Sequence, residues 1–221
     1  MVDFNQRLEQ GLNILGMDIS PEAFDRLNLY FIELKKWGKK VNLIAKSASD
    51  EQIIENHFLD SLTILPLLEG AGTHLLDIGT GAGFPALVCK AAYPELVVTL
   101  VEPRLKRVSF LGHIVRTLGL KEVKILSCRV EDEEQLPSTI AFSHITARAV
   151  TEIGSFLQMV ERFSLSSPQL ICMKGPKWRE ELAAASEILD SSAYRFDHVV
   201  DCTLPFSGAD RNIVVFAVIE K

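Results

Sequence analysis

The fold of this chain is decided by the stretch Leu75-Leu76-Asp77-Ile78-Gly79-Thr80-Gly81-Ala82-Gly83-Phe84-Pro85. An apolar run typical of a buried strand leads into the glycines and a helical pattern follows them, so they lie at a strand-to-helix turn. Because glycine has no Cβ, the backbone at such a turn can adopt positive φ and approach a ligand closely. The stretch therefore predicts a ligand site at the carboxyl edge of a parallel sheet, beside a helix N-terminus.

From residue 70 onward, short apolar runs alternate with helical patterns, which predicts βαβ units. The expected strands are residues 74–78, 97–102, 123–126, 142–147 and 169–173, and the expected helices are residues 85–93, 105–119, 150–163 and 178–189. Two further strands, 196–202 and 212–220, have no helix between them and should pair antiparallel. This order predicts an α/β fold, the Rossmann-like seven-stranded sheet of class I methyltransferases with its last strand antiparallel.

Residues 1–69 are expected to form an N-terminal helical extension, and residues 70–221 the methyltransferase domain. Phe4, Leu8 and Leu12 recur at helical spacing. Ser20-Pro21 combines an N-cap with proline at the first helical position, and this second helix should end near Gly38. Residues 49–52 match a capping box, which opens a third helical stretch expected to run up to Pro66.

The bulk composition limits the class of protein. The chain has 221 residues, 48% of them hydrophobic and 24% charged, which is ordinary for a globular protein. Its net charge of −6 argues against a protein that coats duplex nucleic acid, so any nucleic-acid contact requires a local basic patch. We expect a cytoplasmic protein without membrane contact, because the sequence has no secretory signal and no apolar run of spanning length. Its four cysteines are widely separated, so free thiols and no metal site are expected.

The spacing of the loop glycines discriminates between two cofactors. They follow the pattern G-x-G-x-G, and Phe84 stands where the dinucleotide fingerprint G-x-G-x-x-G has its third glycine. A phenylalanine there obstructs the close helix–strand packing that the fingerprint needs. Asp77 favours S-adenosylmethionine, whose sulfonium and ammonium groups are cationic, whereas it would repel a pyrophosphate. The loop residues Asp77, Gly79, Gly81, Gly83 and Phe84 are therefore candidates for binding this methyl donor.

Two more candidate anchors follow successive strands. Glu102 ends the second expected strand, where a carboxylate can accept hydrogen bonds from both ribose hydroxyls; the alternative is a solvated carboxylate at a strand end. Residues 128–132 follow the third strand, where a carboxylate or backbone amide can meet the adenine edge; alone, they are equally consistent with an acidic loop. Three such features in the right order support one another.

The sequence also resembles a known family, the RsmG (GidB) 16S ribosomal RNA methyltransferases. The resemblance extends from about residue 29 to the end of the chain. The matching stretches are residues 37–43, 57–62, 75–85, 106–111, 147–149, 173–175 and 210–215. The most specific block is His57-Phe58-Leu59-Asp60-Ser61-Leu62, because methyltransferases in general do not carry it.

The resemblance implies methyl transfer to N7 of one guanine, guanine 527 in the usual rRNA numbering, in the 530 loop of 16S rRNA. It also implies that the cofactor site is lined by Gly79, Phe84, Val130, Glu131 and Arg148. The sequence departs from the family's usual residues at Ala86, Glu102-Pro103, Val130 and Ala147. The family commonly has serine where Ala147 stands, so one hydroxyl near Arg148 is missing.

Guanine N7 has a free lone pair, so its methylation needs in-line positioning and exclusion of water rather than a general base. Arg148, which follows the fourth expected strand, is the candidate catalytic residue in this positioning sense; the alternative is a surface arginine at a strand end. His57 and Asp60 share one helix face, and both a polar pair near the cleft and a purely structural role are open.

Basic residues that could hold RNA gather in three places, and a solvated helix face is the alternative for each. Trp178 could stack on a base. The candidates for RNA contact are Lys39, Lys40, Lys106, Arg107, Lys174 and Arg211. The expected partner is 16S rRNA within the small ribosomal subunit or its precursor, bound by a monomer. Two other functions fit the same fold: a small-molecule methyltransferase, and a cofactor-binding regulatory module without turnover.

Overall fold

A computed structural model describes residues 3–68, 70, 72–149 and 151–219 of the chain. Its centre is a seven-stranded sheet in the order β3-β2-β1-β4-β5-β7-β6. Five strands pair in parallel, and β7 pairs antiparallel with both β5 and β6. The strands are β1 (His74–Ile78), β2 (Val97–Val101), β3 (Val123–Leu126), β4 (His144–Arg148), β5 (Gln169–Lys174), β6 (Tyr194–Thr203) and β7 (Asp210–Val218). The predicted parallel core with its terminal antiparallel hairpin is confirmed.

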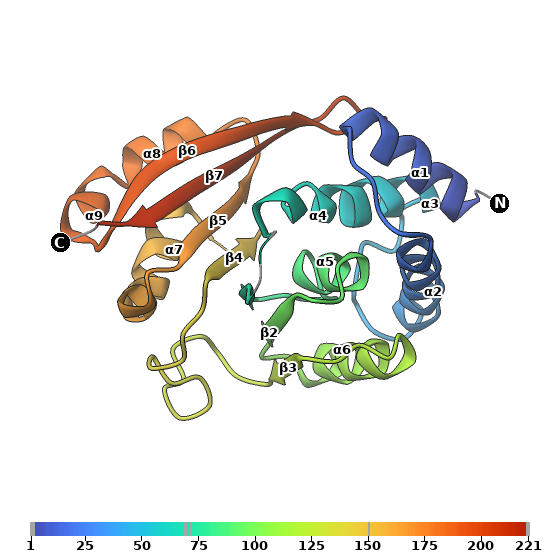
Figure 1. The fold of residues 1–221 in the computed structure, drawn as a ribbon, viewed down its shortest axis with the longest axis horizontal. Coiled ribbons are helices and arrows are strands. Elements are labelled where there is room, and N and C mark those ends of the chain that lie inside the picture. The colour runs from blue at the N-terminus through green and yellow to red at the C-terminus, as the bar shows by residue number, and fades with distance from the viewer. Residues whose placement is uncertain (1–2, 69, 71, 150, 220–221) are drawn as a thin grey trace.

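Helices cover both faces of the sheet, so each face has its own hydrophobic core (Figure 1). On one side lie α5 (Ala86–Ala92) and α6 (Leu105–Thr117); on the other lie α7 (Ile153–Val160), α8 (Trp178–Ala184) and α9 (Ser186–Ser191). Successive residues of a strand serve opposite cores, as the two-residue period of a strand requires. In β5, for example, Ile171 belongs to the first core and Cys172 to the second.

The N-terminal helices belong to the first of these cores rather than to a separate one. They are α1 (Phe4–Leu15), α2 (Pro21–Gly38) and α3 (Asp50–Ile53). Their buried residues, such as Leu8 and Leu27, join a cluster with Leu75 and Val98 of the sheet. The expected division of the chain between residues 69 and 70 falls at Glu69, which lies outside the described residues.

The helix caps predicted for this region are confirmed. The Ser20 side chain accepts a hydrogen bond from the Ala23 amide, and α2 ends at Gly38. Ser49 and Gln52 form both hydrogen bonds of a capping box. Each bond satisfies an amide that the first turn of a helix leaves without an intrahelical partner.

The third helical stretch differs from the expected single helix. It continues as a π-helix, Ile54–Leu59 (η1), followed by α4 (Asp60–Leu62) and a 3₁₀ turn, Leu65–Leu68 (η2), which contains Pro66. The buried Glu55 carboxylate accepts hydrogen bonds of 2.8 Å from the amides of Phe206 and Ser207, in the β6–β7 connection. These contacts anchor the π-helix to a segment distant in sequence, and π-helices occur frequently at functional sites.

Other elements differ from prediction mainly at their ends. The expected strand 142–147 is β4, which begins and ends later, and the expected helix 178–189 divides at Ala185 into α8 and α9. The expected helix 150–163 is α7 followed by a 3₁₀ segment, Glu161–Ser166 (η3). Two expected ends, Val150 and Glu220, lie outside the described residues.

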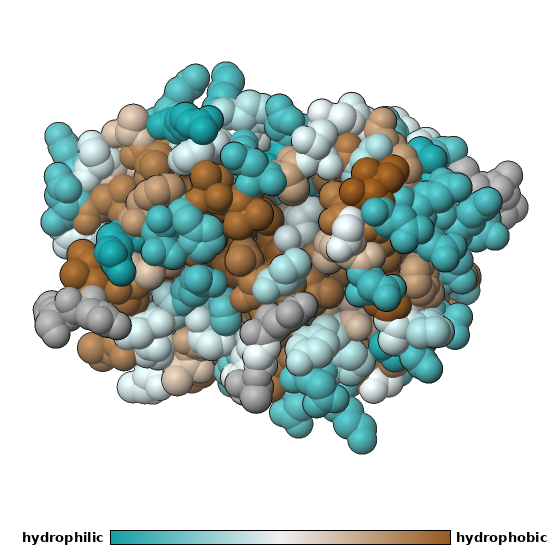
Figure 2. Space-filling model, turned by 45° about the horizontal axis from the view of Figure 1, so that its top comes forward, coloured by the Kyte–Doolittle hydropathy of each residue, from teal (hydrophilic) through white to brown (hydrophobic). Residues whose placement is uncertain are grey.

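The exposed surface is mixed. On the face seen in Figure 2, hydrophilic residues are interspersed with patches of hydrophobic ones. The most exposed large apolar side chains are Leu165, Leu105 and Ile14. Within the described part of the chain, no helix is both long and apolar enough to cross a membrane.

Replacing Gly83 by alanine is expected to destabilise the protein by about 2 to 3 kcal/mol, from positive-φ strain combined with steric overlap. Gly83 has φ +93°, and a Cβ there would overlap the Tyr30 hydroxyl and lie 2.9 Å from Leu87 Cβ. Gly208 is a matched control, because it has φ +68° but nothing within 4 Å of an added Cβ. Chemical denaturation of both alanine variants measures the difference; equal losses would contradict the steric part of this explanation.

Candidate active site

Two adjoining cavities open at the carboxyl ends of the central strands. We call the first the glycine-loop cavity; its volume is about 390 Å³, and it is lined by Leu43, His57, Gly79, Thr80, Gly81, Ala82, Phe84, Glu102, Pro103, Arg104, Arg107, Arg148 and Ala149. We call the second the arginine cavity; its volume is about 640 Å³, and it is lined by Asn56, His57, Asp60, Arg148, Ala149, Thr151, Glu152, Met173, Lys174, Gly175, Glu181 and Arg211. Three residues, His57, Arg148 and Ala149, line both cavities and therefore separate them.

The glycine loop is held between β1 and β2. Gly79 and Gly81 have positive φ values of 68° and 62°, which favour glycine, and both line the glycine-loop cavity. The Gly79 amide donates to the Val101 carbonyl at 2.9 Å. The Gly81 amide donates to a carboxylate oxygen of Glu102 at 3.0 Å. The loop is thereby fixed with its Cβ-free backbone against the cavity.

Glu102 is buried at the wall of this cavity, with 2% of its surface exposed, and is not a solvated strand-end carboxylate. Its Oε1 accepts from the Arg104 amide at 2.9 Å. Its Oε2 accepts from the Gly81 amide, and Arg107 Nη1 lies 3.4 Å away. A carboxylate offers about four acceptor positions, so Glu102 can still accept a hydroxyl of a ligand.

Asp77 lies behind the loop, fully buried, and does not line the cavity. Its Oδ2 accepts from the Thr80 hydroxyl at 2.7 Å and from the Ala86 amide at 3.2 Å, which ties the loop to α5. Its Oδ1 is buried with no hydrogen-bond partner in the described structure. Burial raises the pKa of Asp77 to about 7, against the lowering effects of Thr80, the Ala86 amide and Arg148.

This pKa predicts that the ligand-free protein loses stability as the pH rises from about 4 to about 7. In that window folded Asp77 holds a proton that the unfolded chain has released, so unfolding becomes easier with increasing pH. The effect is about 1.4 kcal/mol for each unit by which the pKa is raised. Asp77→Asn keeps an oxygen acceptor for Thr80 and the Ala86 amide but cannot ionise.

Melting temperatures of the wild type and Asp77→Asn at pH 5 and pH 8 measure this effect. Relative to the wild type, the melting temperature of the variant should be higher at pH 8 than at pH 5. A constant difference would show that Asp77 does not change its protonation there.

Arg148, at the end of β4, is held on three sides. Its Nη1 donates to the Asn56 carbonyl at 2.9 Å and to Asp60 Oδ2 at 3.0 Å. Its Nη2 lies 3.2 Å from His57 Nδ1, which must be the acceptor because a guanidinium has only donors. The guanidinium carbon lies 5.2 Å from the centre of the Phe84 ring. Its orientation is therefore fixed at the boundary of the two cavities.

The residues that hold Arg148 are themselves fixed. Asp60 is 4% exposed and also accepts from Arg211 Nε at 2.8 Å, so one carboxylate joins two arginines. The His57 ring stacks on Phe84, with 4.9 Å between ring centres. Burial, and to a smaller extent the charge of Arg148, lowers the pKa of His57 to about 4. His57 is thus neutral near pH 7, as an acceptor for Arg148 must be.

The candidate cofactor residues divide into three groups by position. Gly79, Gly81, Phe84, Glu102 and Arg148 line the glycine-loop cavity. Asp77 and Gly83 support the loop from behind, the latter against Tyr30.

Val130 and Glu131 line neither cavity. Val130 is buried and its carbonyl accepts from Arg162 Nη1 at 2.7 Å, whereas Glu131 is exposed. Their role in binding therefore stays a prediction.

The candidate RNA residues are similarly dispersed. Lys174 and Arg211 line the arginine cavity, and Lys174 Nζ lies 2.7 Å from Glu181. Arg107 lies inside the glycine-loop cavity, where it contacts Glu102 and, at 3.4 Å, the Asn42 carbonyl. Lys40 and Lys106 are exposed outside both cavities.

Two other residues with expected roles lie elsewhere. Lys39 lines a third cavity, beside α2. Trp178, considered as a stacking residue, is buried and packs against Phe196 with 6.2 Å between ring centres.

The structure adds residues that sequence reasoning had left without a role. His57, Asp60 and Asn56 position Arg148, and Leu43 closes one side of the glycine-loop cavity. His57 and Asp60 lie in the block of residues 57–62, and the family specificity of that block was the sequence signal that could have identified them. Nothing in the local pattern marks Asn56, because it contributes only its backbone carbonyl.

Comparison with known proteins identifies strong similarities. The family model described as "rRNA small subunit methyltransferase G" (GidB) matches residues 23–214. A protein of Desulfotalea psychrophila named "Ribosomal RNA small subunit methyltransferase G" is 55% identical, over 96% of this chain and 98% of its own length. A Myxococcus xanthus protein with the same name is 37% identical, over 97% of each chain.

Solved structures show the same fold at low sequence identity. A SAM-dependent methyltransferase from Aquifex aeolicus is similar with a TM-score of 0.55 and 22% identity, covering 84% of this chain and 98% of its own. M. jannaschii TYW2, solved in complex with AdoMet, has a TM-score of 0.56 and 12% identity, covering 74% of this chain and 76% of its own. The fold is that of the class I methyltransferases.

Proposed function

The chain belongs to the rRNA small subunit methyltransferase G family, and from this premise we propose that it methylates N7 of a guanine in the 530 loop of 16S rRNA. Its methyl donor is S-adenosylmethionine and its substrate class is small-subunit rRNA. The guanine corresponds to guanine 527 in the usual rRNA numbering. The protein acts as a monomer on the small subunit or its precursor.

One observation carries this proposal: two cavities meet at Arg148, and each suits one reactant. In the glycine-loop cavity, Glu102 can accept ribose hydroxyls, and Leu43, Phe84 and Pro103 supply apolar surface for an adenine ring. Gly79 and Gly81, both at positive φ, present backbone without a Cβ to the same cavity, so a bound donor can approach the loop closely. S-adenosylmethionine, when bound, supplies an electrophilic methyl group on a sulfonium. The residues present fit this donor.

The arginine cavity is the place for the target guanine. Its lining combines the cationic side chains of Arg148, Lys174 and Arg211 with acidic acceptors. Such a mixture of donors and acceptors can hydrogen-bond the edges of a purine, and a base splayed out of an RNA loop can enter it. Arginine and lysine are also the side chains that bind RNA phosphates.

No side chain is required as a base in this transfer, because N7 attacks through its own lone pair. His57, which lies on the boundary beside Arg148, is neutral, and its Nδ1 already accepts from Arg148. The residues therefore act by orientation: Arg148 stays fixed by three partners while the walls of both cavities exclude water. A positioning role for Arg148 follows.

The experiment that tests this proposal supplies labelled S-adenosylmethionine to the protein with three acceptors. These are small subunits from cells that lack the gene, naked 16S rRNA, and a metabolite pool. We expect label in rRNA, at a guanine of the 530 loop made cleavable by reduction and aniline treatment, as N7-methylguanine is. Label in a metabolite alone, or at another rRNA position, would reject the proposed specificity.

A further inference from the structure

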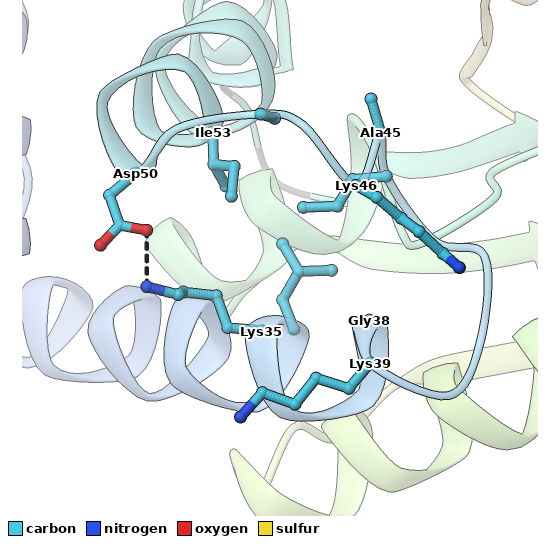
Figure 3. A pocket seen from close by; sticks show the side chains of 10 residues that line it. Lys35, Gly38, Lys39, Ala45, Lys46, Asp50 and Ile53 are labelled. Carbon is cyan, nitrogen blue, oxygen red and sulfur yellow. Dashed lines mark hydrogen bonds and ion pairs between the residues drawn. The ribbon is translucent and has the colours of Figure 1, made fainter.

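A third cavity lies outside the two that form the active site. It has a volume of about 390 Å³ and lies between α2, the following loop and α3 (Figure 3). We call it the lysine cavity, because Lys35, Lys39 and Lys46 line it. Its size falls within the range of about 300 to 1,000 Å³ that is usual for cavities that bind small ligands.

The lysine cavity is basic at its rim and apolar inside. Leu34, Ile44 and Ile53 supply the apolar lining. Three lysines and a single carboxylate, Asp50, line this cavity, in a chain whose overall net charge is −6. This local excess of positive charge matches a polyanion and contrasts with the rest of the molecule.

Two of the lysines are available to a ligand. Lys35 Nζ pairs with Asp50 at 2.5 Å, and this pair closes one end of the cavity in Figure 3. Lys39 extends from the end of α2 and Lys46 from the loop that follows. Both are exposed, and within the described part of the chain neither makes an ion pair or a side-chain hydrogen bond.

The lysine cavity is joined to the active site through the backbone. Ile44 lines the lysine cavity, and its neighbour Leu43 lines the glycine-loop cavity. The preceding residue, Asn42, accepts from Arg107 of the glycine-loop cavity at 3.4 Å. The lysine cavity therefore adjoins the glycine-loop cavity, with lining residues that are neighbours along the chain.

We propose that the lysine cavity binds one nucleotide of the substrate RNA other than the target guanine, with its base on the apolar lining and its phosphates on Lys39 and Lys46. The substrate RNA carries both of the groups that these two features suit. A phosphate alone does not need an apolar interior, and single-stranded RNA presents unstacked bases next to charged phosphates. This inference rests on the proposed function, because it assigns a second contact to the same substrate.

The test measures binding of a fluorescent 16S rRNA fragment that carries the 530 loop, by anisotropy at several salt concentrations. Lys39→Ala/Lys46→Ala should weaken binding about tenfold at 0.1 M salt. The slope of log affinity against log salt should become shallower by about 1.4, since each single-strand phosphate contact contributes about 0.7. The control, Lys121→Ala/Lys124→Ala, removes the same charge from exposed lysines before and within β3 and should bind normally.

A second variant tests whether RNA binding depends on the cavity itself or only on the charge of the lysines. Ala45 lines the lysine cavity and is exposed, so Ala45→Trp fills the cavity while it keeps every lysine. It should weaken binding of the fragment but leave the salt slope at the wild-type value. Melting temperature and calorimetric affinity for S-adenosylmethionine, measured on each variant, should match the wild type and identify any general damage.

Three results would overturn the inference. The double lysine variant could bind like its control, or Ala45→Trp could bind like the wild type. Weaker binding only to assembled subunits, and not to the RNA fragment, would assign the cavity to a ribosomal protein instead. Failure of the proposed function is distinguishable, because it is the absence of label in rRNA with wild-type protein, whatever the fragment binding shows.

Discussion

Arg148→Ala is expected to lower the rate of methyl transfer by about 10²- to 10³-fold, comparable to loss of a preorganised active-site donor. The side chain is held by the Asn56 carbonyl, His57 and Asp60 at the boundary between the two cavities. Its removal leaves the other walls of both cavities in place but takes away a side chain that forms the boundary between them. The reacting groups therefore lose their alignment. The measurement is single-turnover transfer to small subunits with saturating S-adenosylmethionine.

Lysine cannot replace this arginine. Arg148 donates from two nitrogens to three acceptors, two on the π-helix and one at the start of α4. The planar guanidinium is rigid, whereas an ammonium is a compact point charge. We therefore expect Arg148→Lys to recover little of the lost rate. Arg116→Ala removes an equal charge from the exposed end of α6 and serves as the control. Wild-type turnover by a folded Arg148→Ala protein would remove Arg148 from the active site.

The strands of the sheet could be predicted from the sequence because the patterns that indicate a strand are local. Apolar runs separated by helical patterns predict β1 and β3 at their observed bounds. The turn after β1 requires glycine because its backbone adopts positive φ, and two of these glycines line the glycine-loop cavity. In contrast, helix ends such as Ala185 depend on packing and were not predicted.

The π-helix was beyond local prediction for a physical reason. Its anchor, the Glu55 carboxylate, binds two amides about 150 positions away in sequence, as the separations of 151 and 152 residues show. Similarly, the loop after β3 is tied to Arg162, whose Nη1 reaches the Val130 carbonyl from 32 residues away. Such contacts decide where Val130 and Glu131 lie, and no periodicity contains them.

The position of Arg107 shortly after Glu102 was visible in the sequence, but Arg107 was predicted to contact RNA rather than to pair with Glu102. It lies in the first turns of α6, five residues after Glu102, and its charge predicted contact with RNA. The strand-to-helix turn between them brings the guanidinium back over the carboxylate, so it lines the glycine-loop cavity. A basic residue so close after a strand-end carboxylate is therefore also a candidate partner for that carboxylate.

Asp60→Ala is expected to lower the rate of transfer by about 10²- to 10³-fold, as Arg148→Ala does, and to lower the free energy of unfolding by about 3 to 5 kcal/mol. The carboxylate is buried between Arg148 and Arg211, at 3.0 Å and 2.8 Å. Without it, two guanidinium groups of like charge share a largely buried site and lose the one carboxylate with which the described residues pair them. Asp197→Ala, which removes an exposed carboxylate beside His198, is the control and should change neither property.

A double-mutant cycle separates the two consequences. If Asp60 acts on transfer through Arg148, the variant Asp60→Ala/Arg148→Ala should be about as inactive as either single variant, because the group positioned by Asp60 is already absent. Its stability should also exceed that of Asp60→Ala, since one of the two uncompensated charges is gone. Rates that multiply across the cycle would contradict a shared mechanism and would give Asp60 a role of its own toward the guanine.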